Sequence, residues 1–584
     1  MLKSVGDYEV AEDYELQPSN NVEDPLLPTH SRHELVPLPP RQQLQRQRQS
    51  MRQKSIFTCL CLNLLILFLA LGLMTCYFGR VTLDKVKSWD QLPPNFKNWL
   101  NDLAPTKTHA DHANFPTDVG YAGPTPTGKE PALMLTAPFL PTHTDVYPLI
   151  PPSAKSSQDF SIIQHWGHLS PYRTVESHGL SESKSLVPET CELDRLIWLQ
   201  RHGARYPTSY PGGPGAFASR LKFATGWTAS GDLSFLNEWN YQLGAEILVP
   251  FGRSQLYDLG VSARIKYGFL LDRFKSKLPV FRTESQDRML KSAQNFAAGF
   301  FGIPAEDQYN LEVIIEAPGF NNSLAPYTTC LHTDNIYEAK LAEWDTMFLQ
   351  KAKKRLQKDM DGYELSLIDI VQMMEMCAYE TVALGYSAFC ELFNQREWKG
   401  FQYRNDLYWW YSGSFGYAPA KAMGIGWVQE LISRLTETRL VEFNSNINSS
   451  FHDDVHFPLG DPLYVDFTHD TLFAHLLPAM NLTTFAETGE LPTDHIPDNR
   501  SFISSRIIPF ATNLQVQVLS CSSDRNIRIV LNDAVVPLTG ISGCPKSKDG
   551  LCPLDAFVSA MHSLIGEVDF AKECGLRRKD GEEE

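Results

Sequence analysis

The stretch that decides the fold runs from Leu193 to Thr208 and reads Leu-Asp-Arg-Leu-Ile-Trp-Leu-Gln-Arg-His-Gly-Ala-Arg-Tyr-Pro-Thr. Its first half is a short, mostly apolar run, which predicts a buried β-strand. Polar residues follow at once, and His202 stands between Arg201 and Arg205. Two guanidinium groups beside one imidazole can hold a phosphate by charge-assisted hydrogen bonds while a ring nitrogen faces phosphorus. Gly203 would let the backbone approach that anion closely.

Two further apolar runs, Leu278–Phe281 and Leu463–Phe467, predict strands that also end in polar residues. Helical patterns cover residues 288–301, 365–375 and 420–436. Strand-like and helix-like segments therefore alternate, which indicates an α/β or α+β class with helical insertions. In open α/β sheets, ligands bind beyond the carboxyl ends of strands, so the polar residues after each run mark the expected site.

The residues after the second and third strands extend the pattern. Arg282 and Arg288 both follow the second strand, and either could supply a third guanidinium. His469 and Asp470 follow the third strand, about 270 residues after His202. A His-Asp pair alone means little, but the preceding strand and its small polar neighbours single this one out.

Arg201-His202-Gly203-Ala204-Arg205-Tyr206-Pro207 resembles the R-H-G-x-R-x-P signature of the histidine acid phosphatases. The pair His469-Asp470 resembles their second signature and is typical of the acid phosphatase and fungal phytase branch. Smaller matches extend the resemblance over most of residues 160–575. It implies an α/β fold with a mixed central sheet and flanking helices, similar to phosphoglycerate mutases, plus a smaller helical domain formed by insertions.

The resemblance also implies an acid phosphomonoesterase that works through a phosphohistidine intermediate, with phytate among the conceivable substrates. His202 would be the nucleophile and Asp470 the general acid. Arg201, Arg205 and His469 would bind the phosphate. The third arginine would be Arg288, because it stands eight residues before an aromatic residue, Phe296. No cofactor or metal is expected, since the arginines supply the positive charge.

An uncharged run of 24 residues, from Ile56 to Gly79, is long enough to cross a bilayer as a helix. Basic residues are more numerous before it than after it, which places the N-terminus in the cytoplasm. We expect a disordered cytoplasmic tail (1–55), a signal anchor (56–79), a Pro-rich stalk (80–157) and a luminal or extracellular catalytic domain (158–584). The result would be a type II protein of the plasma membrane, the vacuole or another endomembrane. A cleaved signal peptide is the competing interpretation.

Eight cysteines lie beyond the apolar run, without metal-site spacing, which favours disulfides over buried thiols. The family resemblance implies four pairs: Cys191 with Cys521, Cys330 with Cys574, Cys377 with Cys390, and Cys544 with Cys552. Four N-x-[ST] acceptors predict a glycoprotein. They are Asn321, Asn448, Asn481 and Asn499.

The net charge of −16 disfavours a nucleic-acid partner. The segment from Arg80 onward is also acidic, which favours a broad phosphatase over a dedicated phytase, whose hexakisphosphate substrate needs a strongly basic cleft. Two other hypotheses stay open. One is a non-catalytic ectodomain that keeps the phosphatase fold as a binding module. The other is a phosphoglycerate-mutase-like transferase, against which the predicted luminal topology speaks.

Overall fold

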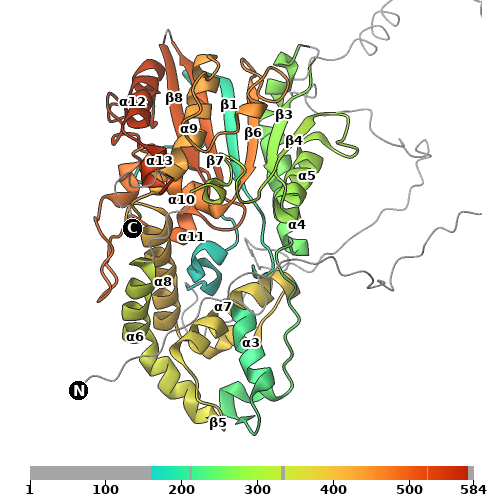
Figure 1. Ribbon diagram of the computed structural model, residues 1–584, viewed down its shortest axis with the longest axis vertical. Coiled ribbons are helices and arrows are strands. Elements are labelled where there is room, and N and C mark those ends of the chain that lie inside the picture. Colours follow the sequence, from blue (N-terminus) through green and yellow to red (C-terminus); the bar gives the residue numbers. More distant parts are fainter. Residues whose placement is uncertain (1–159, 209–212, 276, 331–335, 523, 577–584) are drawn as a thin grey trace, which may run out of the picture. The chain divides into compact units, whose positions relative to one another are not determined.

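The computed structural model describes residues 160–584, apart from 209–212, 276, 331–335, 523 and 577–584 (Figure 1). The predicted tail, signal anchor and stalk (1–157) lie outside the described residues. Within the described part, none of the helices has both the length and the apolar character needed to span a membrane.

The fold is built on a mixed eight-stranded sheet in the order β10, β8, β7, β1, β6, β3, β4, with β9 beside β8. Strands β1, β6, β3 and β4 are parallel, whereas β7 to β10 pair antiparallel. The strands are β1 (Cys191–Arg201), β3 (Val280–Glu284), β4 (Asn310–Ile314), β6 (Leu463–Thr468), β7 (Asn513–Cys521), β8 (Asp524–Leu531), β9 (Ala534–Val536) and β10 (Cys552–Pro553). Two short strands, β2 (Thr228–Ala229) and β5 (Met360–Asp361), form a separate pair.

The helices are α3 (Pro214–Phe223), α4 (Pro250–Tyr267), α5 (Asp287–Phe301), α6 (Ile336–Leu356), α7 (Leu367–Leu384), α8 (Gln395–Gly413), α9 (Ala420–Thr436), α10 (Asp470–Ala479), α11 (Ser504–Ile507), α12 (Leu554–Gly566) and α13 (Phe570–Glu573). The predicted class is confirmed, and the three predicted strands are β1, β3 and β6. Two predicted helices match α5 and α9. The third, α7, continues past Glu375 and ends before Gly385, which adopts a left-handed conformation.

Alternate residues of β1 enter different apolar cores, as expected for a strand covered on both faces. Leu196 and Trp198 pack with residues of α4 and α5. Ile197 and Leu199 pack with residues of α9, α10 and α12. The sheet is therefore the middle layer of three, and two covering helices, α10 and α5, begin just beyond the polar ends of β6 and β3.

Insertions between the strands build a helical lobe from α3, α6, α7 and α8 (Figure 1). Its own apolar core includes Phe217, Met374 and Trp398, all fully buried. Capping boxes start α7 at Ser366 and α8 at Asn394, which satisfies backbone donors that would otherwise be unpaired. This lobe is the smaller helical part that the family resemblance implies.

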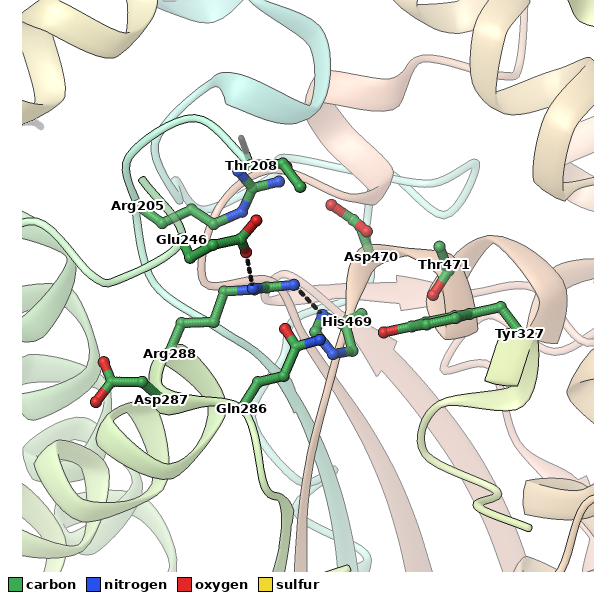
Figure 2. Close-up of a pocket in the computed structure, with 10 residues that line it drawn as sticks. All are labelled: Arg205, Thr208, Glu246, Gln286, Asp287, Arg288, Tyr327, His469, Asp470 and Thr471. Atoms are coloured by element: carbon green, nitrogen blue, oxygen red, sulfur yellow. Dashed lines mark hydrogen bonds and ion pairs between the residues drawn. The ribbon is translucent and has the colours of Figure 1, made fainter. Parts of the chain in front are cut away.

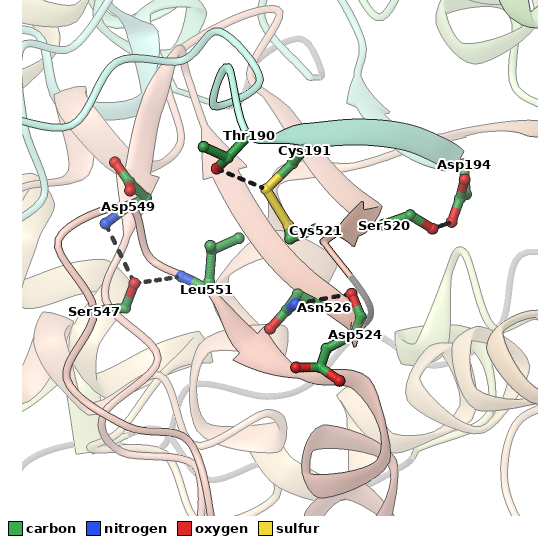
Figure 3. Close-up of a disulfide and its surroundings, with 10 residues drawn as sticks. All are labelled: Thr190, Cys191, Asp194, Ser520, Cys521, Asp524, Asn526, Ser547, Asp549 and Leu551. Atoms are coloured by element: carbon green, nitrogen blue, oxygen red, sulfur yellow. Dashed lines mark hydrogen bonds between the residues drawn. A yellow bond between two sulfur atoms is a disulfide. The ribbon is translucent and has the colours of Figure 1, made fainter.

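Four disulfides link the same pairs of cysteines that the resemblance implies. Figure 3 shows Cys191, at the start of β1, bonded to Cys521, at the end of the neighbouring strand β7. This bond lies at the opposite end of β1 from His202. It therefore fixes the pairing of β1 with β7 and does not contact the expected site.

Candidate active site

His202 follows β1 directly and is 1% exposed. Its Nδ1 lies 2.8 Å from the carbonyl oxygen of Gly203. Because a carbonyl only accepts, Nδ1 must carry the proton and Nε2 keeps its lone pair. Burial, and then the positive charges of Arg201 and Arg205, hold the pKa of His202 well below its ordinary value. The imidazole is therefore neutral and has a free nucleophilic nitrogen.

Gly203 serves a different purpose from the close approach to an anion that its position suggests. A Cβ atom there would lie 2.2 Å from the carbonyl oxygen of Gly252 in α4. The next residue, Ala204, donates its N–H to Gln255 of the same helix at 2.9 Å. The glycine therefore allows the loop that carries His202 to lie against α4, and this packing fixes the loop.

Arg201 is completely buried, and the protein itself holds most of its donors. Its Nη1 donates to the carbonyls of His168 and Ile508 at 2.7 and 2.6 Å. Its Nη2 donates to Asp470 Oδ2 at 2.5 Å. Its Nε is buried and has no hydrogen-bond partner in the described part of the chain. Arg201 is thus a fixed cation beside His202, and its interaction with Asp470 joins the two signature motifs.

Arg205 and Arg288 reach the site from the loop after β1 and from the first turn of α5. Arg205 donates from Nη1 to the carbonyl of Tyr206 at 2.9 Å. Burial would lower the pKa of Arg205, but Tyr379 and Asp470 outweigh burial and raise it. Arg288 Nη1 lies 2.5 Å from Glu246 Oε2, and its Nη2 lies 3.4 Å from His469 Nδ1 (Figure 2). Both side chains face the space in front of His469.

The structure separates Arg288 from its rival Arg282. Arg282 points into the sheet interior, where it makes bidentate contacts of 2.8 to 2.9 Å with Asp466 and Glu430. These contacts occupy its whole guanidinium group. Arg288 is therefore the arginine that the structure brings to the site.

His469 follows β6 directly, precedes α10, and is almost fully buried. Its Nε2 lies 2.6 Å from Glu284 Oε2 and 3.0 Å from Glu316 Oε2. Burial alone would lower the pKa of His469, but the contacts with Glu284 and Glu316 outweigh burial and raise it to about 9. His469 is therefore a cation at acidic and neutral pH.

Asp470 is the first residue of α10 and forms the ion pair with Arg201. Burial would raise the pKa of this carboxyl group, but the positive charge of Arg201 dominates and holds it well below its usual range. Asp470 is thus ionised in the empty site. The N-terminus of α10 adds its dipole at the same place, which favours a bound anion.

A cavity of about 550 Å³ opens in front of these groups (Figure 2). It is lined by Arg205, Thr208, Glu246, Gln286, Asp287, Arg288, Tyr327, His469, Asp470 and Thr471. His202 is not part of the lining; its ring centroid lies 5.8 Å from that of His469. A phosphate that reaches Nε2 of His202 must therefore pass between Arg205, Arg288 and His469.

Across the described residues, one group of side chains has donor atoms close enough together to share a metal ion: Glu284, Glu316 and His469. Nε2 of His469 already lies within hydrogen-bond distance of both carboxylates. We therefore assign this group to hydrogen bonding with His469, and the site's positive charge to the arginines and His469.

Sequence reasoning missed several residues of the site. Glu316 lies two residues beyond β4, a strand that the apolar pattern did not reveal because half of its side chains face solvent. Tyr327 donates to Glu316, as does Gln286. Glu246, which pairs with Arg288, lies in a loop before α4. Only Glu284 and Gln286 could have been found, since both lie between the predicted second strand and Arg288.

Comparison with known proteins shows the family of this chain. Residues 192–532 match the model of the histidine phosphatase superfamily, branch 2. The chain belongs to this family.

Similar curated proteins include phytases of several fungi. Phytase A of Aspergillus oryzae is 32% identical over 425 residues, which cover 69% of this chain and 89% of that protein. A phytase of Candida albicans is 30% identical over 441 residues, 73% of this chain and 89% of that protein. Among solved structures, the phytase from D. castellii superposes with a TM-score of 0.59 at 25% identity, covering 72% of this chain and 89% of that one. The fold is thus that of a phytase-like histidine phosphatase.

Proposed function

We propose that the chain is an acid phosphomonoesterase in which His202 is phosphorylated during each turnover. One observation carries the proposal: a neutral imidazole, with its Nε2 lone pair free, is surrounded by Arg201, Arg205, Arg288 and the cationic His469. A neutral nucleophile within a cationic shell suits attack on a phosphate dianion, because the shell offsets the repulsion of the anion and leaves the lone pair available.

In the first step, Nε2 of His202 forms a bond to phosphorus while the bond from phosphorus to the ester oxygen breaks. Asp470 gives its proton to the departing oxygen, so the leaving group is a neutral alcohol. In the second step, water attacks phosphorus and transfers a proton to Asp470, and the bond between phosphorus and nitrogen breaks. Arg205, Arg288 and His469 stabilise the equatorial oxygens throughout.

Asp470 must gain a proton before it can act as an acid. In the empty site Arg201 keeps it ionised. A phosphate dianion bound beside Arg201 would neutralise part of that positive charge and add negative charge next to the carboxylate, and both changes raise the pKa of Asp470. Protonation of Asp470 would then be coupled to substrate binding, which favours an acidic working pH.

The substrate range that we propose is phosphate monoesters in general, with phytate among the compounds to test. The names of the relatives support phytate. The lining of the cavity supports a broad range: beyond Arg205 and Arg288, its described wall has no arginine or lysine, and it carries Glu246 and Asp287. Initial rates on phytate and on p-nitrophenyl phosphate at pH 5 would rank the two.

The decisive experiment is the His202→Ala substitution. We expect turnover of p-nitrophenyl phosphate to fall by at least about a thousandfold in a protein that still unfolds cooperatively, because the change removes the nucleophile. His495→Ala, which alters an exposed histidine, is the matched control. Acid-quenched wild-type protein should carry phosphate on His202. Retained activity in His202→Ala would refute the mechanism, and an inactive wild type would favour the non-catalytic binding module.

We further propose that the chain is a type II membrane glycoprotein whose catalytic domain is luminal or extracellular. The uncharged run 56–79 and its basic N-terminal flank support this proposal. Among the acceptors, Asn321 and Asn499 are exposed, whereas Asn481 donates its side-chain amide to Gly540 at 2.6 Å. We therefore expect glycans on Asn321 and Asn499 first. Extraction by alkaline carbonate, or a soluble chain that starts near residue 80, would contradict the anchor.

A further inference from the structure

The imidazole of His469 has two buried acids on the side away from the phosphate site. Glu284 is the last residue of β3, and Glu316 follows β4, the next parallel strand. Because parallel strands end at the same edge of a sheet, the two carboxylates converge on one atom, Nε2 of His469. Their Oε2 atoms lie 2.6 and 3.0 Å from it.

The two acids differ in what else they contact. Glu316 accepts hydrogen bonds from Gln286 and Tyr327, two neutral groups. Glu284 is fully buried, and its ion-pair partner within the described residues is His469. Its other close ionisable neighbour is Glu316 itself.

Two carboxylates this close to each other do not both hold a full charge in a buried site, so the pair is expected to share one proton. The environment divides the roles. Burial raises the pKa of Glu284, whereas the hydrogen bonds from His469 and the other donors lower that of Glu316. The pair then carries one negative charge, located mainly on Glu316, and that charge faces His469.

We propose that Glu284 and Glu316 are positioning residues which together hold His469 as an imidazolium, so that its Nδ1–H donates to the bound phosphate. This inference rests on the proposed phosphatase function. Arg288 Nη2 lies 3.4 Å from Nδ1, so a proton on Nδ1 would make both groups donors toward the phosphate site. Tyr327, on the next element, lies with its ring centroid 5.7 Å from that of His469.

The other groups around His469 would remove its charge if the acids were absent. His202 is neutral, Arg288 is cationic, and burial disfavours a charged ring. Without the acids, the pKa of His469 would fall below its ordinary value, and the site would lose one positive charge and one donor at neutral pH. Asp470 cannot replace the acids, because it is already paired with Arg201.

A shared charge predicts redundancy. In Glu284→Gln, Glu316 remains ionised; in Glu316→Gln, Glu284 loses its acidic neighbour and can ionise in its place. We therefore expect each single variant to keep kcat/KM for p-nitrophenyl phosphate within about threefold of wild type from pH 5 to pH 7. In the double variant the ratio to wild type should fall about tenfold or more between pH 5 and pH 7, mainly through KM. Glu312→Gln, a buried glutamate on β4 that pairs in register with Arg282, is the matched control and should leave the profile unchanged.

A second measurement reads His469 directly. In 15N-histidine-labelled His202→Ala protein, with the signal assigned through a His469→Gln variant, His469 should show a doubly protonated ring at pH 7. The added Glu284→Gln and Glu316→Gln substitutions should convert it to the neutral form. A double variant whose pH profile matches wild type, or a neutral His469 ring at pH 7 in the parent, overturns the proposal. An inactive wild type would refute the phosphatase function instead, and the ring signal would still decide the state of His469.

Discussion

The arginines of the sheet interior and those of the phosphate site are both buried, but they differ in how fully the protein neutralises them. In the interior, Arg282 and Arg434 face Asp466 and Glu430, so two cations meet two acids. Trp427 donates to Asp466 as well, at 3.0 Å. Apart from Nε of Arg434, each guanidinium nitrogen and each carboxylate oxygen of these four residues has a hydrogen-bond partner.

In the phosphate site the neutralisation is incomplete. No carboxylate within the described ranges lies at ion-pair distance from Arg205. Arg288 has only Glu246, whose side chain is 44% exposed. Nε atoms of Arg201, Arg205 and Arg288 are buried without partners in the same ranges. In the sheet interior the matched charges stabilise the fold. In the phosphate site, the unpaired donors beside a cavity are suited to bind an anion.

The largest effect is expected from breaking the matched set. Arg282→Ala would leave Asp466 and Glu430 buried with too few cations, which costs about 3 to 5 kcal/mol of unfolding free energy. Urea unfolding at pH 7 measures it. Asp454→Ala, at a carboxylate that is 98% exposed, should change stability by less than about 0.5 kcal/mol. Comparable losses in the two variants would mean that the interior network contributes no more than a surface pair.

Asp470 shares a property with each of the two groups. Like Asp466 it forms an ion pair with a buried arginine, but that arginine, Arg201, belongs to the phosphate site. Asp470→Asn should reduce kcat for an alkyl phosphate by about a hundredfold and for p-nitrophenyl phosphate by less than about tenfold, since nitrophenolate leaves without a proton. Steady-state rates at pH 5 on both esters test this. Equal losses on the two esters would mean that Asp470 is not the general acid and only holds Arg201 in place through their ion pair.

Removal of an unpaired donor of the phosphate site should lower activity and leave stability nearly unchanged, in contrast to Arg282→Ala. Arg288→Ala is expected to lower kcat/KM by about thirtyfold while it changes the unfolding free energy by less than about 1 kcal/mol, because its partner Glu246 is half exposed. Arg288→Lys should recover only part of the activity, since a lysine cannot reproduce a planar pair of donors. A stability loss like that of Arg282→Ala would mean that Arg288 stabilises the fold and is not a free donor for the phosphate.

The contrast also explains what the sequence could reveal. Arg201, His202 and Arg205 stand at the end of a strongly apolar strand and in the short loop after it, and Ala420–Thr436 has a continuous helical pattern of apolar residues, so both were predictable. The pair of acids beside His469 depends on β4, an edge strand in which two of the five residues are exposed. Its short sequence pattern does not distinguish it from a loop. When β4 is not recognised as a strand, the sequence gives no indication that Glu316 lies beside His469.

Long-range packing accounts for the rest. Gly203 looks like a residue that admits an anion, yet its neighbour is the backbone of Gly252, about fifty residues away. Arg282 lies within β3 and Arg288 lies shortly after it, in α5, and no local pattern shows which of them faces the sheet interior. The family spacing to Phe296 selects Arg288, and the structure supplies the physical reason, since Asp466 and Glu430 already occupy Arg282.

The smallest effect concerns a buried base that has no ion pair with an acid among the described residues. His475 is 2% exposed and donates Nδ1–H to the carbonyl of Gly413 at 2.8 Å, and burial lowers its pKa to about 4. Unlike His469, it is stable only when neutral. A base whose folded pKa is depressed contributes stability that is present above pH 6.5, its ordinary value, and lost as the pH falls toward 4.

We therefore expect the unfolding free energy of the wild type to fall between pH 7 and pH 5, with His475 responsible for about 2 kcal/mol of the loss. His475→Gln should be less stable than wild type at pH 7, because the hydrogen bond to Gly413 is weakened, but its own loss from pH 7 to pH 5 should be smaller by that amount. His495→Gln, at an exposed ring, is the control and should follow the wild-type curve. Parallel curves for His475→Gln and wild type would show that the core accepts a charged ring at this position, and that a buried base here needs no acid to carry a charge.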